Sequence, residues 1–214
     1  MPDSITPQRE LVYLLHGIAA QPWMMSPLAK RLEQGGYDVH NWGYPSTRGS
    51  IEDHSGQLAA AMRESAADPS VRTVHVVAHS MGSIVTRHAL SQFRPENLGR
   101  VVLLGPPNHG SPWATVFGPL LRPLCRPVDQ LAGRVGSFVN ELGPFDTVDF
   151  GVIAATRDLL VPLKSTHLAG QRDHREVACF HSMLLFREDV AQLVRNFLAH
   201  GTFSSLSPSA ARCG

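Results

Sequence analysis

The sequence predicts an α/β protein with a mostly parallel sheet of about six strands flanked by helices. Short apolar, β-branched runs alternate with segments of helical period, which is the pattern of strands joined by crossover helices. The 214 residues, of which 43% are hydrophobic and 17% charged, fit one globular domain. We therefore expect a single domain over residues 1–200.

A strand, helix, strand unit opens the chain. Residues 11–15 are expected to form a buried strand, and residues 37–44 a weaker strand closed by Pro45. Between them Ser26 is the expected N-cap of a helix that ends at Gly35.

The same alternation continues to the end of the domain. Ser50 and Asp53 form a capping-box pattern that opens the next helix. The remaining expected strands are residues 73–78, 100–104, 150–155 and 175–180, with helices over residues 82–93 and around residues 190–197.

Residues 106–144 interrupt this alternation with seven prolines and many apolar residues. A long insertion between two strands is typical of a lid or a pocket wall, although covering one face of the sheet is the alternative. The small and polar stretch over residues 201–214 is expected to be a flexible C-terminal tail.

Charge and hydropathy exclude several partners. The 19 basic and 18 acidic residues leave a net charge of +1 without a basic cluster, so nucleic acid is not expected. No apolar run approaches the roughly 18 residues that a membrane-spanning helix needs. Residues 1–10 lack the features of a signal peptide, so we expect a cytoplasmic protein unless a signal was trimmed.

No cofactor or metal is expected. Cys125, Cys179 and Cys213 are an odd number without metal-binding spacing, which also argues against a disulfide framework. The chain lacks a His-Glu-x-x-His motif and a G-x-G-x-x-G loop, and its only lysines, Lys30 and Lys164, do not stand in a phosphate-loop motif.

The clearest chemical motif surrounds Ser80. The segment Ala78-His79-Ser80-Met81-Gly82 stands where the strongest strand meets a helix, and small residues two positions on either side suit a sharp turn. Such a nucleophile elbow holds its serine in a strained backbone conformation with the hydroxyl projecting. Ala78 stands where this pattern usually has Gly, and a loop without chemistry is the alternative.

Together with three further loops, the segment around Ser80 resembles the α/β-hydrolase superfamily, especially its small lipases and esterases. The resemblance extends over about residues 10–200. His16-Gly17 resembles the oxyanion loop that follows the first strand. The resemblance implies that the backbone N–H of Ile18, or alternatively Ala19, and that of Met81 would stabilise an oxyanion.

The other two places resemble the acid and base loops of that superfamily. Residues 156–162 follow a strand and imply Asp158 as the acid, ahead of Asp146, Asp149 and Asp173. Residues 180–185 precede the final helix and imply His181 as the base, with His167 as its strongest rival.

The resemblance implies a serine esterase or lipase in which Ser80 attacks, His181 transfers the proton and Asp158 orients the imidazole. The expected substrate is an apolar ester or a lipid-like small molecule, and peripheral lipid contact is compatible with it. The expected acyl pocket comprises Trp23, Met24, Trp113, Phe117, Leu120 and Leu121. An acyltransferase or thioesterase using the same triad, or a non-catalytic hydrolase-like binding scaffold, are the alternatives.

Overall fold

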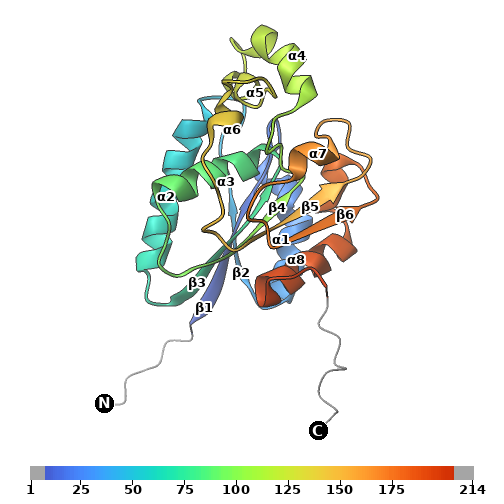
Figure 1. The fold of residues 1–214 in the computed structure, drawn as a ribbon. Coiled ribbons are helices and arrows are strands. Elements are labelled where there is room, and N and C mark those ends of the chain that lie inside the picture. Colours follow the sequence, from blue (N-terminus) through green and yellow to red (C-terminus); the bar gives the residue numbers. More distant parts are fainter. Residues whose placement is uncertain (1–7, 205–214) are drawn as a thin grey trace, which may run out of the picture.

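The sheet of this protein has six strands, all paired in parallel, in the order β2-β1-β3-β4-β5-β6. The computed structural model describes residues 8–204 (Figure 1). The strands are β1 (Arg9–Leu15), β2 (Asp38–Trp42), β3 (Val71–His79), β4 (Leu98–Leu104), β5 (Phe150–Ala155) and β6 (Asp173–Val177). The predicted α/β class and its number of strands are confirmed.

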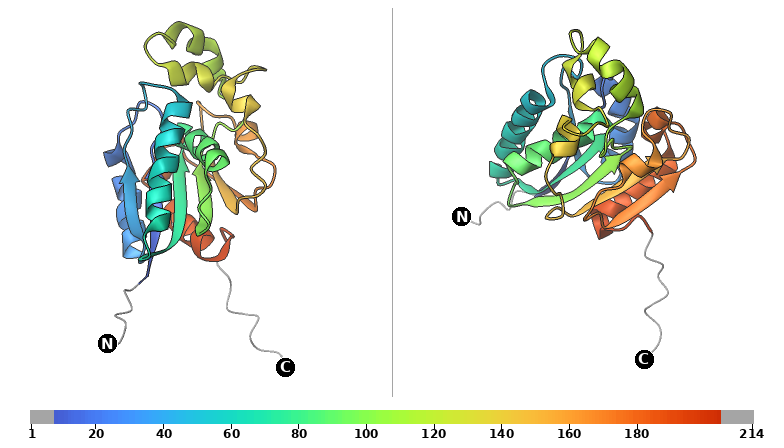
Figure 2. Two further views of the ribbon diagram at one scale, coloured as in Figure 1. Left: turned by 90° about the vertical axis from the view of Figure 1, so that its left-hand side faces the viewer. Right: turned by 45° about the horizontal axis from the view of Figure 1, so that its top comes forward.

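Helices cover both faces of the sheet, as the two views in Figure 2 show. One face packs on α2 (Ile51–Ala67) and α3 (Met81–Gln92), and the other packs on α1 (Ser26–Gln34) and α8 (Glu188–His200). Alternate strand residues pack into two cores, one on each face of the sheet. In β1, Tyr13 and Leu15 face the core beside α2 and α3, and Val12 and Leu14 face the core beside α1 and α8. Because both faces are covered, the central strands are apolar throughout.

Two helix starts show how local sequence sets the element boundaries. The capping box that opens α2 is confirmed, since the Asp53 N–H donates to Ser50 Oγ at 3.2 Å and the Ser50 N–H donates to Asp53 Oδ2 at 2.8 Å. The N-cap expected at Ser26 is wrong, because a 3₁₀ helix, η1 (Pro22–Met25), runs directly into α1. Ser26 is therefore already helical, and Met25 takes the cap position.

The insertion over residues 106–144 forms three short helices above the carboxyl ends of the strands (Figures 1 and 2). These are α4 (Pro112–Leu121), α5 (Arg126–Gln130) and α6 (Phe138–Glu141). Val128 of α5 and Val139 of α6 belong to the core that includes α2 and α3, whereas Val116 and Leu120 of α4 are largely exposed. The insertion thus covers part of the core and also projects beyond it.

The last described residues pack against the domain. We expected a flexible tail from residue 201, but the Phe203 ring is buried and its centroid lies 4.8 Å from that of Phe197. The Phe203 N–H also donates to Asp173 Oδ2 at 2.7 Å. Because these contacts anchor Phe203, the expected tail does not start at residue 201. Residues 205–214 lie outside the described part of the chain.

Within residues 8–204, no helix has both the length and the apolar character needed to cross a membrane.

The buried histidines make the stability of the fold depend on pH. Burial is the main cause that lowers the pKa of six of them, His16, His54, His75, His79, His88 and His174. The unfolded chain takes up these protons near pH 6.5, whereas the folded chain resists them. The free energy of unfolding should therefore fall as the pH drops below about 6.5. Each of the buried histidines His16, His54, His75 and His79 should contribute at most about 1.4 kcal/mol per pH unit, and the half-buried His88 and His174 less.

We expect the melting temperature to decrease steadily between about pH 7.5 and pH 5.5, measured by differential scanning calorimetry. A His54→Phe variant should show a shallower decrease, because it lacks one buried imidazole whose two nitrogens have no hydrogen-bond partner. His200→Gln, at an exposed position, is the control and should follow the wild type. A melting temperature that is constant or rises toward pH 5.5 would contradict the explanation.

Candidate active site

Ser80 sits in a strained turn between β3 and α3. Its backbone angles are φ 53° and ψ −123°, and among the non-glycine residues described only Ala19 and Ser80 have a positive φ. Such a conformation costs free energy and persists only where the surrounding structure enforces it. The Ser80 N–H donates to the Leu104 carbonyl of β4 at 2.8 Å, which holds the turn against the sheet. The structure thus has a strained turn at Ser80, whereas the role of Ser80 as a nucleophile stays a prediction.

Two glycines allow the turn to approach the loop after β1. A Cβ added at Gly17 would lie 2.9 Å from Ser80 Cβ, and one added at Gly82 would lie 2.7 Å from the His16 carbonyl oxygen. Both distances are too short for ordinary packing, so larger residues at these two positions would push the loop and the elbow apart. Ala78 stands where Gly is usual. Its side chain is buried in the core that includes α3.

Asp158 and His181 form a buried, oriented pair at the carboxyl ends of β5 and β6. The Asp158 carboxylate accepts hydrogen bonds from the N–H groups of Leu160 and Val161 through Oδ1, and from His181 Nδ1 through Oδ2. The Asp158 side chain is 1% exposed and the His181 side chain 9%. Because Nδ1 is held by the carboxylate, Nε2 is the nitrogen left for proton transfer.

His181 and Ser80 both lie at the end of β4. A Cβ added at Gly105, the residue after Leu104, would lie 3.0 Å from His181 Cε1, so the imidazole packs directly over this glycine. The rings of His79 and His181 lie 4.7 Å apart between centroids. Within residues 8–204, the His181 side chain hydrogen-bonds to Asp158 and not to Ser80. Contacts between base and nucleophile are often looser without a substrate.

His79 is buried next to this pair but is not equivalent to His181. Burial lowers the pKa of His79 well below its usual range, and the nearby His181 lowers it further. His79 is therefore neutral at pH 7 and adds no positive charge beside His181.

Met81 and Ile18, the expected oxyanion donors, lie in the two segments that approach each other at Ser80. Met81 is the first residue of α3, where helix geometry leaves the N–H without an intrahelical acceptor. Ile18 lies in the loop after β1 and lines the same cavity as Ser80. Strands β1 and β3 are neighbours although β2 lies between them in sequence, so both loops open at a switch point of the sheet.

Ser80 lies at an apolar cavity of about 260 Å³. Of the predicted substrate residues, Trp113 lines it, together with Ile18 of the oxyanion loop. Ala19, the alternative oxyanion donor, lines it as well. The cavity is also lined by residues that were not predicted from the sequence: Pro107, Ser111, Ala114, Val128, Leu131, Leu160 and Val161. Leu160 and Val161 lie two and three residues after Asp158, and this proximity is a signal that could have indicated them.

The other five predicted substrate residues do not line this cavity, which corrects that expectation. Trp23 is 68% exposed, and Met24 packs against the core on the α1 and α8 side of the sheet. Phe117 and Leu120 are exposed, and Leu121 packs on the opposite core. Phe117 and Leu120 share a helix face with Trp113, so position along α4 explains the difference: only residues near its first turn line the cavity at Ser80.

The rival histidine and aspartate residues lie elsewhere. The His167 ring stacks on His174 with centroids 4.0 Å apart and is exposed. Asp149 pairs with Arg100, and Asp173 binds the Phe203 N–H. Within residues 8–204, no group of three or more His, Cys, Asp or Glu side chains is placed to hold a metal ion.

Residues 6–137 match the family Hydrolase_4, described as serine aminopeptidase, S33. This match covers more than half of the chain, and the chain belongs to this family of α/β hydrolases. The matched residues include Ser80 and the loop after β1, whereas Asp158 and His181 lie beyond them. No curated protein sequence matches the chain.

Solved structures of lipases and esterases share this fold at low sequence identity. Lipase B of Aspergillus fumigatus has a TM-score of 0.74 at 18% identity, over 91% of this chain and 53% of the lipase. This chain therefore spans about half the length of that enzyme. The mature lipase BlEst2 of Bacillus licheniformis has a TM-score of 0.64 at 17% identity, over 94% of each chain. The esterase Pf2001 of Pyrococcus furiosus has a TM-score of 0.63 at 17% identity, over 92% of this chain and 84% of the esterase.

We expect Gly17→Ala to slow the reaction of Ser80 with a fluorophosphonate, measured by intact-mass spectrometry over time. The added methyl group would meet Ser80 Cβ at 2.9 Å, and displacing a reacting group by about 1 Å can cost about a hundredfold in rate. Gly143→Ala is the matched control, because no heavy atom lies within 4 Å of its added Cβ. Equal labelling rates in the two variants would show that the close contact is not needed.

Proposed function

We propose that this protein hydrolyses carboxylic esters with apolar acyl groups, using Ser80, His181 and Asp158 as a catalytic triad. The observation that carries the proposal is the buried Asp158–His181 pair beside a strained serine that opens into an apolar cavity. A serine hydroxyl is a weak nucleophile, and an oriented imidazole is what activates it.

In the proposed reaction, Ser80 Oγ attacks the ester carbonyl carbon while its proton passes to His181 Nε2. The carbonyl oxygen becomes an oxyanion that accepts hydrogen bonds from the N–H groups of Ile18 and Met81. His181 then returns the proton to the leaving alcohol as the carbon–oxygen bond breaks. Water then attacks the acyl-enzyme carbonyl carbon and gives a proton to His181. His181 returns this proton to Ser80 Oγ as the bond from Oγ to the acyl carbon breaks, which releases the carboxylic acid and regenerates the Ser80 hydroxyl.

The lining of the Ser80 cavity favours an ester over a peptide with a free N-terminus. Its polar side chains are the hydroxyls of Ser80 and Ser111, and none of its residues is charged. An ammonium group would therefore be desolvated there without a partner, which is costly. The family described as serine aminopeptidase and the lipase and esterase neighbours share the fold, and this apolar lining is our reason for choosing esters.

The cavity size favours acyl chains of short to medium length. Its volume of about 260 Å³ is close to the lower end of ordinary ligand pockets, which begin near 300 Å³. Burying each methylene contributes up to about 0.8 kcal/mol, or about fourfold in kcat/KM, until the cavity is full.

We expect a fluorophosphonate to label wild-type protein at Ser80, and Ser80→Ala to abolish both labelling and hydrolysis of 4-nitrophenyl butanoate. Peptide mapping locates the label, and circular dichroism confirms that the variant is folded. Labelling of a different serine, or residual hydrolysis at the wild-type rate, would exclude Ser80 as the nucleophile.

We also expect kcat/KM to rise from acetyl to hexanoyl 4-nitrophenyl esters and then to level off. Trp113→Ala should lower the value for the hexanoyl ester about tenfold more than that for the acetyl ester, because only the longer chain reaches the indole. Leu120→Ala, on the same helix but outside the cavity, is the control and should keep the wild-type profile. If Trp113→Ala lowered kcat/KM equally for all esters, Trp113 would not contact the acyl chain.

A further inference from the structure

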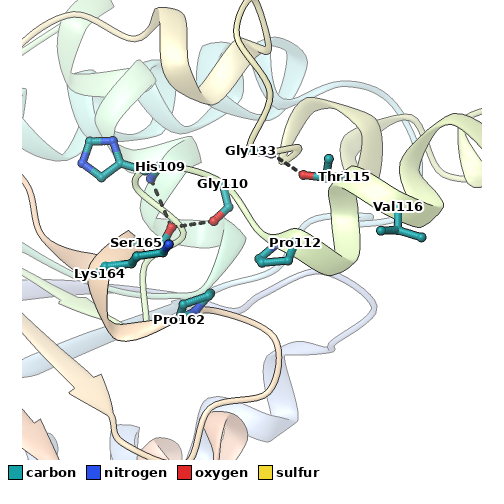
Figure 3. A pocket seen from close by; sticks show the side chains of 9 residues that line it. All are labelled: His109, Gly110, Pro112, Thr115, Val116, Gly133, Pro162, Lys164 and Ser165. Atoms are coloured by element: carbon teal, nitrogen blue, oxygen red, sulfur yellow. Dashed lines mark hydrogen bonds between the residues drawn. The ribbon is translucent and has the colours of Figure 1, made fainter.

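A second and larger cavity, of about 680 Å³, lies on the other side of the first turn of α4 (Figure 3). It is bounded by α4 on one side and by the segment that leads into α7 (Leu163–Thr166) on the other. Its main lining residues are His109, Pro112, Thr115, Val116, Pro162 and Lys164. None of these residues lines the cavity at Ser80.

Helical spacing explains why one short helix serves two cavities. Pro112, Thr115 and Val116 are three and four residues apart and share one face of α4. Trp113 and Ala114 point to the Ser80 cavity instead. A single layer of chain therefore separates the two spaces, and the hydroxyl of Ser111 secures it by donating to the Leu160 carbonyl at 2.6 Å.

Most polar atoms around the second cavity are already hydrogen-bonded. The Ser165 hydroxyl donates to the Gly110 carbonyl and accepts from the His109 N–H (Figure 3). The Thr115 hydroxyl donates to the Ser111 carbonyl at 2.9 Å and accepts from the Gly133 N–H at 2.7 Å. These groups shape the cavity but leave few donors or acceptors for a polar ligand.

The side chains of His109 and Lys164 are the exceptions, since neither forms a hydrogen bond within residues 8–204, and Lys164 carries the charge. Its ammonium group is the only formally positive charge among the lining residues when histidine is neutral, and no carboxylate within residues 8–204 forms a salt bridge with it. Pro112, Val116 and Pro162 provide the apolar wall beside it. The cavity thus combines an apolar surface with one unpaired cation.

We propose that this second cavity binds an alkyl carboxylate, with the chain against Pro112, Val116 and Pro162 and the carboxylate at Lys164. A singly charged headgroup matches one ammonium group, and an alkyl chain matches the apolar wall. A volume of about 680 Å³ is within the range of sites for molecules of this size. The site does not involve Ser80, so this proposal can be tested independently of the proposed ester hydrolysis.

The test is isothermal titration calorimetry of decanoate against the wild type and two charge-reversal variants. Lys164→Glu should weaken binding about tenfold, because it replaces attraction of the carboxylate by repulsion. Lys30→Glu is the matched control: it alters the net charge equally at an exposed site on α1 and should bind as the wild type does. Decan-1-ol, which lacks the charge, should bind Lys164→Glu and the wild type equally.

Two substitutions on α4 locate the alkyl chain. Val116→Asp, at an exposed position that lines the second cavity, should weaken decanoate binding, whereas Trp113→Ala, which alters only the Ser80 cavity, should not. The proposal is overturned if Lys164→Glu and Lys30→Glu bind equally well. It is also overturned if Trp113→Ala alone reduces binding, or if the wild type binds no decanoate up to about 1 mM.

Discussion

The strained backbone at Ser80 is the constraint on which the active site depends. β3 must become α3 within one residue, and the cost of that conformation is offset by the surroundings: the Ser80 N–H bonds to β4, and α3 is buried against the core. The turn can close only because Gly17 and Gly82 lack side chains where the loop after β1 approaches it. The same close approach places Ile18 in the lining of the cavity at Ser80.

The parallel sheet brings the other groups to the same edge. Because every strand runs in the same direction, the loops after β1, β3, β4, β5 and β6 all leave from one end. Gly105 after β4 provides the flat surface on which the His181 ring lies, and Asp158 after β5 holds that ring by Nδ1. Two backbone N–H groups hold the carboxylate in turn, so the pair is set before any substrate arrives.

The insertion completes the surroundings of Ser80. Its first helix, α4, is too far above the sheet to be buried on all sides, and its apolar residues are therefore divided among the Ser80 cavity, the second cavity and solvent. Val128 and Leu131 complete the Ser80 cavity from the opposite direction, where α5 joins the core. The wall between the cavities is thin, and the bond from Ser111 to Leu160 ties it to the loop that carries Asp158.

The strands, the capping box at Ser50, the turn at Ser80 and the local contexts of Asp158 and His181 could be predicted from the sequence. These features depend on periodicity and on turn chemistry within a few residues, so predicting them needs no knowledge of distant contacts. Which insertion residues line the cavity at Ser80 could not be predicted in this way, because it depends on how distant segments pack. Apolar residues at helical spacing occur around α4, and the position of the whole helix relative to the sheet determines that Trp113 lines the cavity while Leu120 faces solvent.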